Sequence, residues 1–262
     1  TATIPGYGLL GLEDFELPPQ RVIDALVHRL AAQQSTDGRW GRLSSRPPLG
    51  SSDVTDTALA LRTLKRFSLP GRQREFDGRI QRGTAWLRQV HPSSTEERVF
   101  QLLGLAWAET KPGQLKKLAA ALLAEQRADG GWAQLPTLES DAYATGQAMY
   151  ALHLAGGLPV SHPAYQRGLR FLRETQHPDG SWFVRTRTFP FQKHFDTGFP
   201  HGKDQWISAA GTAWAAMALL LTIEPSSDKP APFQAAATPL SSPSPLVPPT
   251  NARNSACEPQ PN

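Results

Sequence analysis

Gln34-Ser-Thr-Asp-Gly-Arg-Trp40 is the first of three copies of one short pattern; the others are Gln126-Arg-Ala-Asp-Gly-Gly-Trp132 and Gln176-His-Pro-Asp-Gly-Ser-Trp182. Each copy places Asp three, Gly four and Trp six residues after its Gln. Four matched positions would rarely recur three times by chance. Self-similarity of this kind indicates an architecture built from repeated units.

A helix is predicted before each copy. Apolar residues recur at spacings of three and four before the first copy, at Val22, Ile23, Leu26, Val27 and Leu30. The stretches before the second and third copies show the same spacing, at Leu115, Leu118, Leu122 and Leu123, and at Tyr165, Leu169, Phe171 and Leu172. The Asp-Gly pair then ends each helix, because Gly tolerates the left-handed conformation found at helix ends.

A second helix is predicted after each copy. Segments 52–61 and 140–149 align and both begin with Ser-Asp, a favourable pair for a helix N-terminus, and 208–217 is a third such segment. A decayed fourth unit lies between the first two copies, because 82–88 matches 167–173. Its end at Ser94, followed by Glu97, predicts a capping box that opens the next helix.

The fold class that follows is all-α, with eight helices in four hairpins. The helices are expected to start near residues 20, 53, 79, 95, 114, 141, 163 and 206. Composition divides the chain into a lead segment (1–19), a helical repeat domain (20–223) and a tail (224–262). The tail holds ten of the 24 prolines and is too poor in apolar residues to offset its chain entropy, so we expect it to be disordered.

Several functional classes are disfavoured by composition. The net charge of +4 comes from scattered basic residues without a basic run, so we expect no nucleic-acid partner. No apolar stretch is long enough for a membrane span. The single cysteine, Cys257, cannot form an internal disulfide framework or a thiolate zinc cluster. The chain begins at Thr1 without an initiator Met, as a processed product or a fragment would, and we favour an extracytoplasmic or membrane-associated location.

The repeated pattern resembles the QW motif of squalene-hopene cyclases. The paired helices resemble the α/α toroid that these enzymes share with protein prenyltransferase β-subunits, over roughly residues 20–222. The resemblance implies a structural role for the motif, in which the Gln amide stacks on the Trp and bonds to the end of an adjacent helix. That role would apply to Gln34, Trp40, Gln126, Trp132, Gln176 and Trp182. Such toroids have about six hairpins, so four hairpins predict an incomplete ring.

The resemblance also identifies a candidate acid. These cyclases protonate an alkene with the middle Asp of a DxDD-type motif followed by Thr-Ala, and the matching segment here runs from Asp53 to Ala58. Thr55 occupies the donor position, and its hydroxyl is not a useful general acid. Two interpretations of the flanking carboxylates remain. Asp53 could be a helix N-cap with Asp56 in the first turn, or Asp56 could be a displaced acid, kept protonated by burial beside Asp53.

A loop rich in aromatic residues supplies the candidate ligand-binding residues. The segment 196–200 resembles a Thr-Gly-Phe-Pro stretch of squalene-hopene cyclases, in which Phe199 would face a carbocation, although Lys203 stands where the family has another aromatic. The loop either lines a pocket or packs over the mouth of the toroid. The candidates are Phe189, Phe191, Phe195, Phe199 and Trp206, together with Tyr143 and Trp214 on predicted helices.

No metal or other cofactor is expected. The zinc site of prenyltransferases needs a cysteine, and no paired histidine motif is present. We interpret the chain as a squalene-cyclase-like module, noncatalytic or re-purposed, that binds an isoprenoid or other lipophilic ligand or a protein partner. The alternatives are an active class II terpene cyclase that uses Asp56 or Asp53 as the acid, and an assembly module of a larger complex.

Overall fold

The computed structural model describes residues 7–8, 21–41, 47–48, 52–69, 71–189 and 193–223. The chain divides into two units, Thr1–Glu224 and Pro225–Asn262, and the description below concerns the first. Most of the lead segment (1–19) and all of the tail (224–262) lie outside the described residues. The assignments of the lead segment and of the disordered tail therefore stay predictions.

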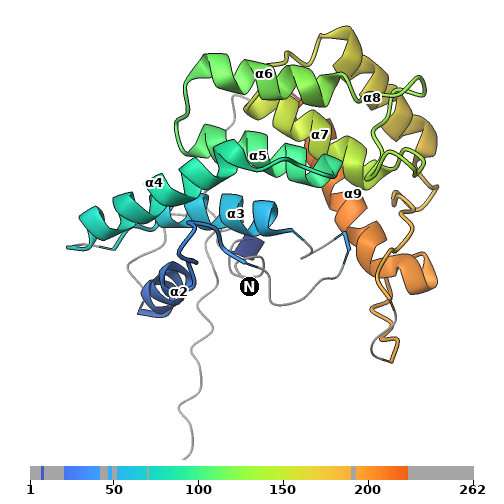
Figure 1. The fold of residues 1–262 in the computed structure, drawn as a ribbon. Coiled ribbons are helices and arrows are strands. Elements are labelled where there is room, and N and C mark those ends of the chain that lie inside the picture. Colours follow the sequence, from blue (N-terminus) through green and yellow to red (C-terminus); the bar gives the residue numbers. More distant parts are fainter. Residues whose placement is uncertain are drawn as a thin grey trace, which may run out of the picture. The chain divides into compact units, whose positions relative to one another are not determined.

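The described residues form helices and no strand (Figure 1). The eight α-helices are α2 (Arg21–Ala32), α3 (Asp53–Arg66), α4 (Gln73–Gln89), α5 (Thr95–Trp107), α6 (Pro112–Leu123), α7 (Ala142–Leu154), α8 (Pro163–Thr175) and α9 (Gln205–Leu220). A short 3₁₀ helix, η1 (Gly202–Asp204), precedes α9. The helices pack in antiparallel pairs, which confirms the predicted all-α fold of eight paired helices. α4 begins several residues before its predicted start near residue 79.

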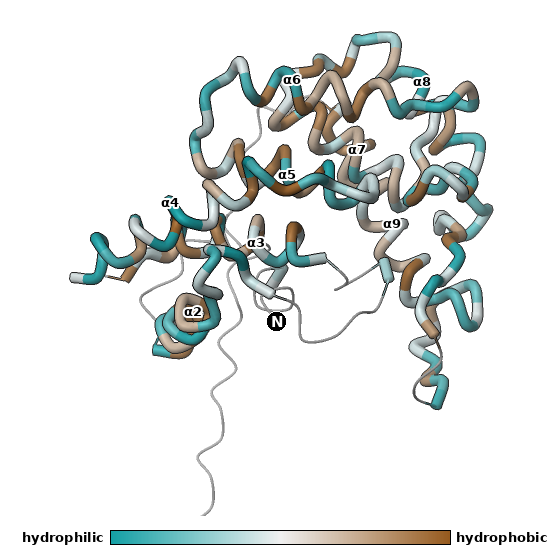
Figure 2. Tube along the Cα trace, viewed as in Figure 1, coloured by the Kyte–Doolittle hydropathy of each residue, from teal (hydrophilic) through white to brown (hydrophobic). Residues whose placement is uncertain are grey.

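The helices form an inner and an outer row. Helices α3, α5, α7 and α9 pack side by side in that order and make up the inner row. On them lie the outer helices: α2 on α3, α4 on α3 and α5, α6 on α5 and α7, and α8 on α7. Figure 2 shows hydrophilic residues along much of the outer helices α4 and α8. An outer helix therefore buries one face, whereas an inner helix meets neighbours on several sides.

Small residues allow the inner helices to pack closely. A side chain on Gly104 of α5 would come within 2.7 Å of the Ala58 side chain of α3. A side chain on Gly146 of α7 would come within 2.5 Å of the backbone of Trp214 of α9. The inner helices therefore approach closely at these two glycines, because no side chain separates them.

Side chains cap the inner helices where the sequence suggested. Ser52 is the N-cap of α3, where its hydroxyl accepts the backbone N–H groups of Val54 and Thr55. Asp53 is therefore the first residue of the helix, and its interpretation as the N-cap is corrected. At α5, Ser94 caps by accepting the N–H of Glu97 at 3.2 Å, as predicted from the capping box.

Candidate functional site

The first copy of the repeated pattern, residues 34–40, joins two hairpins, and we call it the first joint. Gln34 Nε2 donates to the carbonyl oxygen of Gly38 at 2.8 Å and to that of Arg79 of α4 at 2.9 Å. Arg82, one turn further along α4, donates to Gln34 Oε1 at 3.0 Å. A planar amide thereby ties the turn of one hairpin to the outer helix of the next.

The second copy, residues 126–132, forms a second joint with the same contacts. Gln126 Nε2 donates to the carbonyl oxygen of Gly130 at 2.9 Å and to that of Ala164 of α8 at 2.7 Å. Arg167 of α8 donates to Gln126 Oε1, as Arg82 does to Gln34. The first and second joints thus hold outer helices α4 and α8 by equivalent bonds.

The third copy, residues 176–182, is the third joint, and its Gln has fewer partners. Gln176 Nε2 donates to the carbonyl oxygen of Gly180 at 3.0 Å, and no described residue supplies a helix carbonyl to it. The tryptophans of all three joints are buried, and each indole N–H donates to the carbonyl of a preceding helix, at Leu30, Leu122 and Leu172. These contacts support a scaffold role for the six repeat residues.

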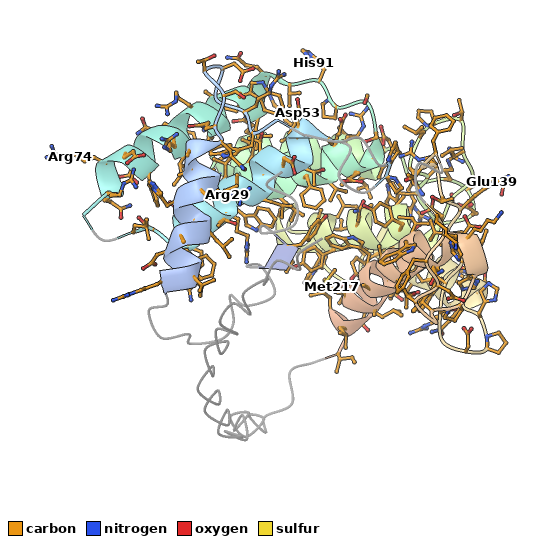
Figure 3. The ribbon with its side chains drawn as sticks, turned by 90° about the horizontal axis from the view of Figure 1, so that it is seen from below. Arg29, Asp53, Arg74, His91, Glu139 and Met217 are labelled. Atoms are coloured by element: carbon orange, nitrogen blue, oxygen red, sulfur yellow. The ribbon has the colours of Figure 1, made fainter. Side chains whose placement is uncertain are left out.

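The two candidate acids on α3 lie in different surroundings. Asp53 lies in the first turn of α3 (Figure 3) and forms an ion pair with Arg39 at 3.5 Å, with a quarter of its side chain exposed. Asp56 is buried, with an exposed fraction of 1%. Asp56 therefore faces the interior, and Asp53 faces the surface beside the first joint.

A third carboxyl group, Glu96, lies in a buried polar cluster between three inner helices. Glu96 is in the first turn of α5 and is 6% exposed. Its Oε1 accepts a hydrogen bond from the Thr55 hydroxyl of α3, and its Oε2 accepts one from the Tyr143 hydroxyl of α7, both at 2.9 Å. Thr55 is the residue that the resemblance places at the proton-donor position. A carboxyl group from the neighbouring helix therefore lies within hydrogen-bonding distance of that position.

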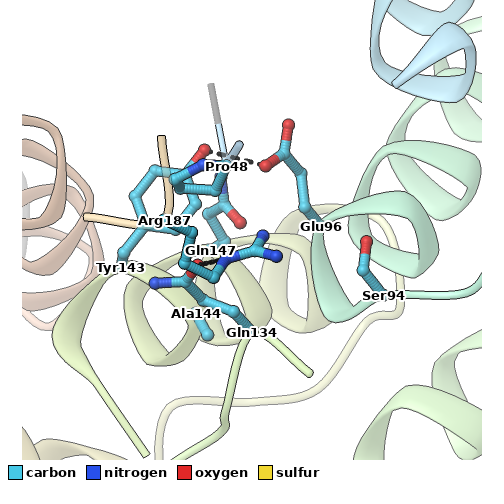
Figure 4. Close-up of a pocket in the computed structure, with 8 residues that line it drawn as sticks. All are labelled: Pro48, Ser94, Glu96, Gln134, Tyr143, Ala144, Gln147 and Arg187. Carbon is cyan, nitrogen blue, oxygen red and sulfur yellow. Dashed lines mark hydrogen bonds between the residues drawn. The ribbon is translucent and has the colours of Figure 1, made fainter. Parts of the chain in front are cut away.

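A small pocket opens beside Glu96 (Figure 4), with about 180 Å³ of space between its atoms, open solvent at its mouth included. One wall is a chain of polar contacts, in which Arg187 Nε donates to Gln134 Oε1 at 2.8 Å and Gln134 Nε2 donates to Asp141 Oδ2 at 2.9 Å. The lining residues are Pro48, Ser94, Glu96, Gln134, Tyr143, Ala144, Gln147 and Arg187. Polar and apolar atoms contribute about equally to this lining, and the space is below the several hundred Å³ of typical ligand sites.

Burial determines the acidity of the cluster. It raises the pKa of Glu96 to about 7, although hydrogen bonds from Thr55 and Tyr143 and the charge of Arg187 act to lower it. Burial also raises the pKa of Tyr7, and the charges of Glu96 and Asp56 raise it further. A carboxyl group with a raised pKa is a weaker acid than an ordinary one. Glu96 suits proton exchange near neutral pH and is poorly suited to protonate an alkene.

The structure separates the aromatic candidates into two groups. Tyr143 and Trp214 are buried; Tyr143 lines the pocket, and the Trp214 ring packs edge-on against the rings of Phe100 and Tyr150. The loop candidates lie at the surface instead: Phe189 is 87%, Phe195 65% and Trp206 56% exposed, and Phe199 is half-buried. Phe191 lies outside the described residues. Within the described part of the chain, only Tyr143 of these candidates lines the pocket beside Glu96.

Sequence reasoning missed Glu96 and Arg187. Glu96 lies in the first turn of a capped helix, where a glutamate is ordinarily an exposed residue that interacts with the helix dipole. Arg187 belongs to a loop without periodicity. A signal for Glu96 existed in the two adjacent glutamates: Glu97 completes the cap through Ser93 at 2.6 Å, so Glu96 was free for another role.

The described residues offer neither a metal site nor a membrane-spanning helix. They contain no group of three or more His, Cys, Asp or Glu side chains arranged to hold a metal ion. Of the helices they form, none is long and apolar enough to cross a membrane.

Residues 78–175 match the family model of the squalene-hopene cyclase N-terminal domain. The matched segment runs from α4 to the end of α8, contains the second joint and covers roughly a third of the chain. The predicted resemblance to squalene-hopene cyclases is confirmed over this segment. No curated protein matches the chain.

Proposed function

We propose that this chain is a re-purposed squalene-cyclase-like module that binds a protein partner and does not cyclise polyprenoids. The observation that carries the proposal is the hydrogen bond from Thr55, at the expected donor position, to the buried Glu96. Thr55 cannot supply a strongly acidic proton, and the carboxyl group beside it has a raised pKa. The group at the expected reaction centre is therefore too weak an acid for the cyclase reaction.

Exposed aromatic side chains favour a protein partner. Phe195 and Trp206 lie at the surface with ring centroids 6.5 Å apart, and Phe189 on the same connection before α9 is more exposed than either. Large aromatic residues contribute most of the binding energy at many protein interfaces. The pocket beside Glu96 is small, and Glu96 and Arg187 are among its lining residues, which does not suit an isoprenoid. A lipophilic ligand remains the second candidate for the aromatic surface.

The catalytic part of the proposal is tested by incubating purified protein with squalene and with shorter polyprenoids and analysing the products by mass spectrometry. We expect no cyclised product. A product that disappears in Asp56→Asn or Glu96→Gln would overturn the proposal and support the alternative of an active cyclase with a displaced acid. Glu174→Gln, a change at an exposed glutamate of α8, is the matched control.

The binding part is tested with the double variant Phe195→Ser, Trp206→Ser. Proteins captured from lysate by the wild-type chain are identified, and the candidate is then purified and titrated against both forms. We expect the variant to lose about tenfold or more in affinity, as for two aromatic residues at the centre of an interface. Equal affinity of the two forms would exclude this surface, and selective extraction of a lipid by the wild type would favour the lipophilic ligand instead.

A further inference from the structure

We propose that a second copy of this chain docks its helix α2 on the third joint and α9, as α4 docks on the first joint and α8 on the second. The proposal is independent of the chemistry at Glu96. It depends on a comparison of three equivalent turns in one chain, of which two have an outer helix against them.

The third joint has the same internal structure as the other two. In each turn the Gly N–H donates to a carbonyl three residues earlier, at 2.9 to 3.0 Å. In each, the Asp side chain accepts the N–H of the residue two positions later. The backbone N–H of each Trp donates to the hydroxyl of a Thr on the following inner helix, namely Thr57, Thr145 and Thr212. The third joint therefore already has the turn conformation and internal hydrogen bonds of the two joints that contact an outer helix.

Among the described residues, no helix lies on the outer side of the third joint. A side chain added to Gly38 or Gly130 would come within 2.6 Å of a carbonyl oxygen of the docked helix, and both glycines are buried. Gly180 is exposed, and a side chain added there would meet only the amide of Gln176, at 4.0 Å. His201 contacts the joint through the Ser181 hydroxyl at 2.7 Å, and this contact leaves Gly180 and Gln176 exposed.

Helix α9 has a matching exposed face. After Gln205 its residues are apolar or small around the whole circumference, and the similarly apolar α7 is buried on nearly every side. Counting from the Thr that bonds each joint, Ala213 is equivalent to Ala58 and Gly146, both of which are covered by the next inner helix. Ala213 is exposed, and Leu220 further along α9 is 61% exposed.

Helix α2 has residues at the positions through which α4 and α8 contact a joint, but no joint of the described residues lies against those positions. At the second joint, the carbonyl that receives the Gln bond belongs to Ala164, twelve residues before Gln176. The residue twelve positions before Gln34 is Val22, which is 69% exposed, and Leu26 one turn later is 38% exposed. On α2, the face that α4 and α8 turn toward a joint is therefore apolar and partly exposed.

Side-chain sizes indicate that this face fits α9. The outer helices of the filled joints have glycine at the position of Leu26. A side chain on Gly83 would meet Leu61 at 2.9 Å and the Trp40 ring of the joint at 3.0 Å, and one on Gly168 would meet Met149 at 2.6 Å. The α9 residue equivalent to Leu61 and Met149 is Ala216. In the proposed contact the outer helix supplies the large side chain, Leu26, and the inner helix the small one, Ala216. This reverses the filled joints, and the two side chains together fill a volume similar to that of each filled pair.

The expected contact is head-to-tail, because α2 and the α9 edge are different surfaces. Such contacts build closed rings when the rotation closes and open chains when it does not. Position 25 is alanine where the filled joints have an arginine, so the bond to the Gln Oε1 is missing. We therefore expect a reversible association that depends on concentration.

Sedimentation velocity of the full chain over a wide concentration range tests the proposal. We expect the mass to rise to at least that of two chains, and Leu26→Lys or Leu220→Lys to weaken association by about tenfold or more. Leu154→Lys, at an exposed leucine on α7 (52% exposed), is the matched control and should leave the association unchanged. Circular dichroism verifies that each variant keeps its helices.

A size exchange distinguishes direct contact from loss of fold. Ala216→Met alone should block association, because the longer side chain at this position would collide with Leu26 of the second copy. Adding Leu26→Gly should restore association by recreating the pair found at the second joint. A monomer at every concentration, a Leu26→Lys variant that behaves like the control, or a double variant that stays monomeric would each overturn the proposal.

Discussion

Glu96→Gln should remove a large part of the pH dependence of folding. The pKa of Glu96 is about 7 in the folded chain, against 4.5 for an unperturbed glutamate. The folded state therefore holds a proton that the unfolded chain has released between these values. The stabilising effect is complete below about pH 4.5 and is lost as the pH rises through 7.

The size of this effect follows from the same two values. A difference of one pKa unit corresponds to about 1.4 kcal/mol. The free energy of unfolding of the wild type should therefore fall by about 3 kcal/mol as the pH rises, most of it between about pH 5 and pH 8. A glutamine at position 96 can still bond both Thr55 and Tyr143, because either hydroxyl can donate to it or accept from it. Glutamine does not ionise, so titration at position 96 no longer contributes to the pH dependence of the variant's stability.

Urea unfolding followed by tryptophan fluorescence at about pH 5 and pH 8 measures the effect. We expect the free energy of unfolding to fall by roughly 2 to 3 kcal/mol more in the wild type than in Glu96→Gln. Glu174→Gln is the control, because Glu174 is exposed. Equal pH dependence in the wild type and Glu96→Gln would show that Glu96 is not the buried acid described above.

Four further substitutions test the scaffold. Thr55→Val should cost about 1 to 2 kcal/mol at pH 8, where Glu96 is ionised, and less at pH 5, as measured by urea unfolding. Gly146→Ala should lower the thermal midpoint strongly, with a cost of about 2 kcal/mol or more, because the new methyl group meets the α9 backbone at 2.5 Å. Gln126→Ala should cost about 1 to 3 kcal/mol in dilute solution, whereas Gln176→Ala should cost under about 0.5 kcal/mol, and similar costs would contradict an open third joint.

The helices and their ends could be predicted because their signals are local. The spacing of apolar residues, the Asp-Gly turns and the Ser94 cap all act within a few residues of chain, and the eight predicted helices are present. The repeated pattern also identified the turns that join hairpins. It did not show that no helix of the described residues lies on the third joint, because that depends on which segments lie outside the turn and not on the turn itself.

The candidate site was predicted less well because burial is a property of the assembled helices. By sequence, Asp53, Asp56 and Glu96 are each a carboxylate in the first turn of a helix. Packing of α3, α5 and α7 leaves Asp53 partly exposed and buries Asp56 and Glu96, and of the three only Glu96 receives both the Thr55 and the Tyr143 hydroxyl. The aromatic loop shows the reverse, since its composition suggested either a pocket lining or packing over the mouth of the toroid, and Phe189, Phe195 and Trp206 lie at the surface.

The sequence by itself determined that this chain folds as paired helices joined by Gln-Asp-Gly-Trp turns, and that the usual donor position holds Thr55. Periodicity and turn chemistry are encoded within single segments, so they can be recognised without the fold. Only the tertiary structure decided that Glu96 reaches Thr55 from the neighbouring helix and that, among the described residues, one of three equivalent joints has no helix against it. The Glu96–Thr55 contact and the exposure of the third joint both depend on residues far apart in the chain. Their distances in space are set by the packing of the helices and not by any local pattern.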